Sequence, residues 1–149
     1  MALQQLTGQE HLAPGFYYLQ LEEPTAFSSY AEFTQTTNWS GPFAATAGNF
    51  AVTVIGRLVT ATLPTTVTTG NSTAAAIVSA TALPSWVRPS NAVRGSCIVV
   101  NAGSTITGSF TVQTTGLINF YNGPFTTNFS STASNVGFSA VTLQWMIGV

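Results

Sequence analysis

The sequence predicts an all-β protein built as an antiparallel β-sandwich or jelly roll. Short runs of β-branched and aromatic residues recur between Gly, Pro and Asn, and helical periodicity is hard to find. The chain has 149 residues, of which 45% are hydrophobic, so it is long enough for one domain with its own core. Many short strands without intervening helices favour an antiparallel arrangement over a parallel sheet.

Alternation of apolar and polar residues locates the clearest strands. In residues 106–112 the even positions are apolar or Gly and the odd positions are Ser or Thr, so Ser109 and Thr111 are expected to face water or a partner. Residues 141–147 carry apolar side chains at odd positions, which indicates a last strand paired inside a sheet. A strand at 50–54 is followed by a change of phase at Gly56, which predicts a turn or a bulge there.

Several further strands and their separators complete the predicted sandwich. Strands are expected at 16–21, 59–63, 74–80, 97–101 and 117–121. Separators are expected at 68–71, 84–89 and 122–124.

Residues 1–36 differ in composition from residues 37–149. They carry all four acidic residues, the one histidine and an aromatic string at 16–18. Two interpretations stay open: an N-terminal arm that joins a stalk or a neighbour, or a first strand of the same sandwich. Residues 37–149 form the predicted β-sandwich head domain.

Charge is scarce and excludes several classes of function. Only 5% of residues are charged, against roughly 25% in ordinary domains, and the net charge is -1. Three scattered arginines cannot neutralise a phosphate backbone, so nucleic acid is not an expected partner. No stretch of apolar residues is long enough to predict membrane insertion, and no signal-peptide pattern predicts Sec export. With so little charge, the electrostatic repulsion between copies of the chain is weak, so a homo-oligomer is expected.

Catalysis is not expected. General acid–base chemistry needs titratable side chains, and from Phe33 onward the chain has no Asp, Glu, His or Lys. Cys97 lies in an apolar run and is interpreted as a small buried hydrophobe. The residues for a metal site or a phosphate-binding loop are absent, so no cofactor and no metal are predicted.

Four residues are candidates for ligand binding, because an uncharged surface recognises sugars or peptides through aromatic, amide and hydroxyl groups. Trp86 lies on a proline-flanked loop and is either an exposed platform or a buried plug, and the high average burial of Trp favours the plug. Tyr121, Asn122 and Phe125 flank an Asn-Gly-Pro turn, whose chemistry alone also explains Asn122.

Three arginines and two tryptophans are expected to have structural or interface roles. Arg88 and Arg94 bracket a Pro-containing loop, and with no acid beyond Glu32 they are expected to donate to backbone carbonyls or to pair with an N-terminal Glu of another copy. Arg57 follows the phase change at Gly56 and is placed in the same group. Trp39 and Trp145 are expected in the core.

Four segments occur in an order that resembles a known family. They are IGRLVT at 55–60, LPSWVRPS at 83–90, GLINFY at 116–121 and VTLQW at 141–145. This order resembles the C-terminal head modules of phage and other viral fibres, which are compact trimeric β-sandwiches related to the C1q and tumour-necrosis-factor jelly rolls. The resemblance implies a homotrimer at the virion surface, held by a fibre stalk or another virion component, that attaches to a host-surface glycan or protein receptor.

Two other functions are weighed against this hypothesis. A structural jelly-roll subunit of a capsid or fibre, with no receptor-binding role, stays open. A glycan-degrading enzyme is disfavoured, because such enzymes usually need two carboxylates beside the scissile bond.

Overall fold

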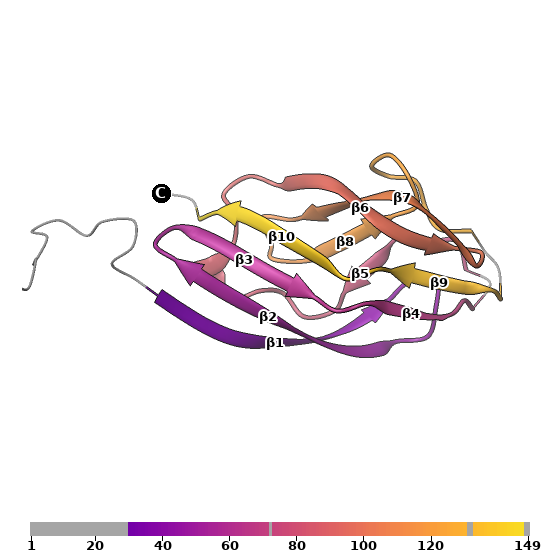
Figure 1. Cartoon of the computed structure of the whole chain (residues 1–149), viewed down its shortest axis with the longest axis horizontal. Coiled ribbons are helices and arrows are strands. Elements are labelled where there is room, and N and C mark those ends of the chain that lie inside the picture. The colour runs from indigo at the N-terminus through magenta and orange to yellow at the C-terminus, as the bar shows by residue number, and fades with distance from the viewer. Residues whose placement is uncertain (1–29, 72, 131–132, 148–149) are drawn as a thin grey trace, which may run out of the picture.

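The computed structural model describes residues 30–71, 73–130 and 133–147, and these residues form an antiparallel all-β fold, as the sequence predicts. Within this part of the chain a single turn of 3-10 helix, η1 (Ser85–Val87), interrupts the strands. Figure 1 shows how the strands are arranged. The strands are β1 (Tyr30–Ser40), β2 (Thr46–Ile55), β3 (Leu58–Leu63), β4 (Thr66–Thr69), β5 (Ile77–Ser79), β6 (Val93–Asn101), β7 (Ser104–Val112), β8 (Ile118–Tyr121), β9 (Asn135–Phe138) and β10 (Val141–Met146).

The strands form one curled sheet in the order β10-β3-β2-β1-β5-β8-β7-β6-β9-β4. β3 leads into β4 and β9 leads into β10, while β3 pairs with β10 and β4 pairs with β9. The same two segments of chain therefore tie the two ends of the sheet together. The half made of β10, β3, β2 and β1 lies against the half made of β5, β8, β7, β6 and β9, which gives a sandwich (Figure 1).

A tight turn at Gly56 explains the change of phase that the sequence shows. β2 ends at Ile55 and β3 begins at Leu58, so Gly56 and Arg57 form the whole connection. Gly56 has a φ of 59°, which glycine adopts without the steric cost of a Cβ atom.

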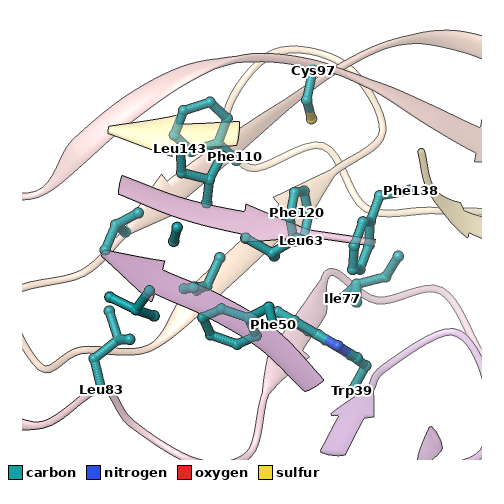
Figure 2. Close-up of a cluster of buried hydrophobic side chains, with 14 of the residues drawn as sticks. Trp39, Phe50, Leu63, Ile77, Leu83, Cys97, Phe110, Phe120, Phe138 and Leu143 are labelled. Carbon is teal, nitrogen blue, oxygen red and sulfur yellow. The ribbon is translucent and has the colours of Figure 1, made fainter. Parts of the chain in front are cut away.

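The core lies between the two halves and is rich in aromatic side chains (Figure 2). Phe120 of β8 stacks on Phe138 of β9 with ring centroids 4.1 Å apart, and Trp39 of β1 meets Phe138 edge to face at 5.0 Å. Because these rings come from both halves of the sheet, they join the two layers. Trp39 and Trp145 are 2% and 4% exposed, which confirms that both belong to the core.

The structure adds β1, which was not among the predicted strands, and it corrects two further details of the strand prediction. Thr68 and Thr69, expected in a separator, belong to β4 and pair with β9. Ser109 and Thr111, expected to face water or a partner, are 4% and 7% exposed. The loop that follows β8 covers Ser109, since the Ser109 hydroxyl donates to the carbonyl oxygen of Gly123 over 2.6 Å.

The N-terminal region falls only partly within the described residues. Residues 30–36, the end of the predicted arm, form the first part of β1 and pair with β2. Residues 1–29, with the strand expected at 16–21, lie outside the described residues.

Candidate functional site

Two rows of polar side chains cross the outer face of β6, β7 and β8. Arg94, Thr111 and Asn119 are paired in register across the three strands. Ser96, Ser109 and Tyr121 form the next row. Residues that pair directly across antiparallel strands point to the same face, so all six side chains lie on the side away from the core.

The loop that follows β8 folds over these rows. The backbone N–H of Asn122 donates to the carbonyl oxygen of Thr127 at 2.9 Å, and that of Thr127 donates to Pro124 at 3.0 Å. The loop is thus a closed turn over residues 122–127, drawn in orange beyond the end of β8 in Figure 1. The bond from Ser109 to Gly123 fastens it to β7. The sequence predicts this reversal from its Asn-Gly pair.

Phe125, near the middle of this loop, lies against Arg94 of β6. The guanidinium carbon of Arg94 is 5.3 Å from the centre of the Phe125 ring, within the range of a cation–π contact. Phe125 is 38% exposed, and Arg94 is exposed as well. The pair presents a positive group and an aromatic face to solvent at the edge of the covered rows.

Two buried amide oxygens, one in β8 and one at the start of the loop, have no hydrogen-bond partner in the described part of the chain. They are Oδ1 of Asn119 and Oδ1 of Asn122, and both atoms are buried. Asn119 is 8% exposed, and its Nδ2 donates to the Tyr121 hydroxyl at 3.1 Å. A buried acceptor left unpaired costs about 1–3 kcal/mol, so a donor from water or from a ligand would be favourable at these positions.

We call Arg94, Asn119, Tyr121, Asn122 and Phe125 the Asn119 cluster. Three of these five residues, Tyr121, Asn122 and Phe125, are among the ligand-binding residues that the sequence predicts. Asn119 and the place of Arg94 beside Phe125 were missed. The signal for Asn119 is an amide residue inside the apolar strand Ile118–Tyr121, a position that strands rarely give to Asn.

Trp86 lies apart from this cluster, and the expectation that it plugs its loop is wrong. It is 51% exposed on η1, and its ring is tilted against Phe33 of β1 with centroids 5.6 Å apart. Val87 and Leu83, at 0% and 1% exposure, fill the space under this loop instead. Trp86 therefore packs on the other half of the sheet from β8.

The other two arginines donate to backbone carbonyls. Nε of Arg88 donates to the Leu83 oxygen at 2.8 Å, one of the two arrangements expected for it. Nε and Nη2 of Arg57 both donate to the Ile147 oxygen, at 3.2 and 2.8 Å, and tie the β2–β3 turn to the end of β10. Both side chains thus serve chain connections rather than the Asn119 cluster.

The described residues offer little for chemistry. Burial raises the pKa of the Cys97 thiol to about 11, so the sulfur is protonated near neutral pH and is a poor nucleophile. Within the described ranges no three His, Cys, Asp or Glu side chains lie close enough to hold a metal ion. The part of the chain that the structure covers contains no helix with the length and apolar character to cross a membrane.

The chain was compared with protein families, curated proteins and solved structures. No protein-family model matches the chain, and no curated protein matches it. Among solved structures, the chain is similar to a reovirus attachment protein, sigma1, in a crystal structure of its complex with alpha-2,3-sialyllactose. The match covers 81% of this chain and 67% of the sigma1 chain, with 11% sequence identity and a TM-score of 0.48. The identity and the TM-score are too low for sigma1 to supply the fold or function of this chain.

Proposed function

We propose that this chain is a non-catalytic binding module, and more particularly a fibre head at a virion surface that attaches to a glycan or protein receptor on a host cell. The observation that carries the proposal is the Asn119 cluster, which combines two buried, unpaired amide oxygens with an exposed Arg–Phe pair. The order of elements that resembles viral fibre heads supports the location and implies three copies in the head.

A glycan is the ligand class that fits the cluster best. Sugar hydroxyls supply the hydrogen-bond donors that Oδ1 of Asn119 and Oδ1 of Asn122 lack. An aromatic ring such as that of Phe125 packs against the apolar face of a sugar ring, and Arg94 donates to its oxygens. Arg94 and Phe125 are exposed and make the first contact, and a shift of the loop after β8 then gives a ligand access to the two buried oxygens.

A structural subunit of a capsid or fibre, with no receptor role, is the second candidate. Four exposed apolar side chains in register on β1, β2, β3 and β10 favour it, because such a row is suited to assembly. The two candidates differ in whether a soluble ligand binds.

The test is binding of the full chain to an array of neutral and acidic host glycans, followed by titration of the best ligand against variants. We expect Asn119→Leu and Phe125→Ala each to weaken binding at least tenfold. Asn119→Leu keeps the number of heavy atoms in the side chain, and it removes both the unpaired acceptor and the donor to the Tyr121 hydroxyl. These two losses act on stability in opposite directions, so thermal unfolding of the variant is measured beside its binding. Thr107→Ala, an exposed change on β7 outside the cluster, is the matched control.

Two results would count against the proposal. One is the absence of binding to every glycan and to host cells. The other is a glycan that binds both cluster variants as tightly as the unchanged chain. The first outcome favours the structural subunit, and the second moves the ligand site elsewhere.

A further inference from the structure

A row of exposed apolar side chains crosses the outer face of the other half of the sheet. Tyr30 of β1 pairs with Ile55 of β2, Ile55 pairs with Leu58 of β3, and Leu58 pairs with Met146 of β10. Their exposed fractions are 65% for Tyr30, 40% for Ile55, 39% for Leu58 and 55% for Met146. Direct cross-strand neighbours share a face, so the four side chains form one continuous stripe, the Tyr30–Met146 row.

The position of the row in the fold separates it from the Asn119 cluster. It lies where β1 and β3 begin and where β2 and β10 end, at the left end of Figure 1. The Asn119 cluster belongs to β6, β8 and the loop after β8, in the opposite half of the sandwich. The two surfaces can therefore be occupied at the same time.

The rest of this face is nearly free of charge. The next two rows of outward positions on the same four strands are mainly polar. The nearer row is Glu32, Thr53, Thr60 and Gln144, and the farther row is Thr34, Ala51, Thr62 and Thr142. Glu32 accepts a hydrogen bond from the Tyr30 hydroxyl at 2.7 Å, and Arg57 at the neighbouring turn donates to the Ile147 oxygen. One acid and one base border the row, so two such surfaces can meet without bringing together an excess of one charge.

The size of the face is of the order that a stable contact needs. Four strands at about 4.8 Å spacing, six to eleven residues long at about 3.3 Å per residue, cover roughly 20 by 20–35 Å. That is about 400–700 Å² before the relief of the side chains is counted, against about 800 Å² per partner in a typical stable interface. The face therefore has exposed apolar residues in a row, almost no charge around them and an area that approaches that of a typical interface. These properties fit a protein partner whose surface has the same properties.

We infer that the Tyr30–Met146 row is the surface through which copies of this chain associate with one another. Other copies of this chain are the partners with matching chemistry, since each brings the same apolar stripe, the same threonine-rich surround and the same Glu32 and Arg57. The inference deepens the proposed assembly of a fibre head by naming the face that assembles, and it makes no use of glycan binding.

The test compares two exposed isoleucines that lie on the outer faces of different halves of the sheet. Ile55 is in the row and is 40% exposed, whereas Ile98 of β6 is 45% exposed on the outer face of the other half. The mass of the full chain is measured by light scattering over a range of concentrations for the unchanged protein, Ile55→Glu and Ile98→Glu. We expect an oligomer for the unchanged chain and for Ile98→Glu, and a monomer of 15.6 kDa for Ile55→Glu at the same concentration.

A second variant keeps the test decisive if Ile55→Glu fails to fold, as judged by circular dichroism. Leu58→Thr places the prevailing residue of this face in the row and suits a strand. We expect it to raise the dissociation constant of the oligomer at least tenfold.

Three outcomes would overturn the inference. They are a monomeric unchanged chain, an oligomer that tolerates both row variants, and an oligomer that Ile98→Glu disrupts as strongly as Ile55→Glu. A monomeric chain assigns the row to another occupant, such as residues 1–29 or a different protein. Glycan binding is measured separately on each variant, so failure here leaves the test of the Asn119 cluster intact.

Discussion

The indole Nε1 of Trp145 donates a hydrogen bond of 2.7 Å to the carbonyl oxygen of Val87. This buried bond joins β10 to η1, two segments that are far apart in the sequence. Trp145 is 4% exposed, while Trp86, the residue before Val87, is 51% exposed. Two tryptophans beside the same helical turn therefore have opposite environments.

Because Trp145 is buried and Trp86 is exposed, replacing each by phenylalanine should lower the free energy of unfolding by different amounts. Trp145→Phe removes the donor, leaves the Val87 oxygen unpaired in the core and creates a small cavity, so we expect a loss of about 2–3 kcal/mol in the free energy of unfolding. Trp86→Phe should change it by less than about 0.5 kcal/mol. Urea unfolding of both variants measures the difference. Equal effects would contradict the placement of the two rings.

Two glycines with similar positive φ values show how much a steric clash adds to the cost of replacing glycine by alanine. Gly103 and Gly116 have φ values of 79° and 88°. A Cβ at Gly103 would meet nothing within 4 Å, whereas one at Gly116 would lie 2.8 Å from Nε of Arg88 and 2.9 Å from the Leu83 nitrogen. Gly103→Ala should cost about 1 kcal/mol from backbone conformation alone, and Gly116→Ala clearly more. Chemical unfolding of the pair checks this, and an equal cost would show that the Arg88 contact is loose.

Because the Cys97 thiol is buried, we expect the free energy of unfolding to fall at high pH. Burial raises its pKa from 9.0 to about 11, so between these values the unfolded chain loses its proton more readily than the folded chain. The stability that the protonated Cys97 thiol contributes is therefore fully present below pH 9, and it is lost as the pH rises towards 11. Cys97→Val lacks this term, so its stability should fall less over that interval. Thermal unfolding of both proteins from pH 8 to 11 measures it, and parallel curves would contradict the buried thiol.

The sequence predicts the strands better than it predicts which faces are covered. Alternation at 106–112 and at 141–147 locates β7 and β10, because a period of two is the geometric signature of a strand. The same alternation predicts that Ser109 faces water or a partner, whereas the structure buries it within the chain. Burial there depends on a loop that starts at residue 122, and a local pattern carries no information about a segment that folds back from elsewhere.

The candidate site is predictable only in part for the same reason. Turn chemistry and aromatic content point to Tyr121, Asn122 and Phe125. Arg94 reaches Phe125 across the strand order, a relationship that exists only after β6, β7 and β8 have paired.

Three strands, β1, β4 and β9, were missed. β1 turns the polar residues Gln35 and Thr37 inward, so its sequence lacks a clear alternation. β4 and β9 have four residues each, and β4 consists mainly of threonine, so both are too short for a clear pattern.

The bond between Ser109 and Gly123 predicts how firmly the loop over the Asn119 cluster is held. Ser109→Ala removes the hydroxyl that donates to the Gly123 oxygen at 2.6 Å, so residues 122–127 should open more often. Chymotrypsin cleaves after exposed aromatic residues, and we expect faster cleavage after Phe125 in this variant. Ser96→Ala is the control, because Ser96 pairs with Ser109 across β6 and β7 but is exposed. Unfolding should show a loss of about 1 kcal/mol for Ser109→Ala and almost none for Ser96→Ala. Equal cleavage rates in the two variants would mean that the Arg94–Phe125 contact, rather than Ser109, holds the loop, and Arg94→Ala would then be the variant that releases it.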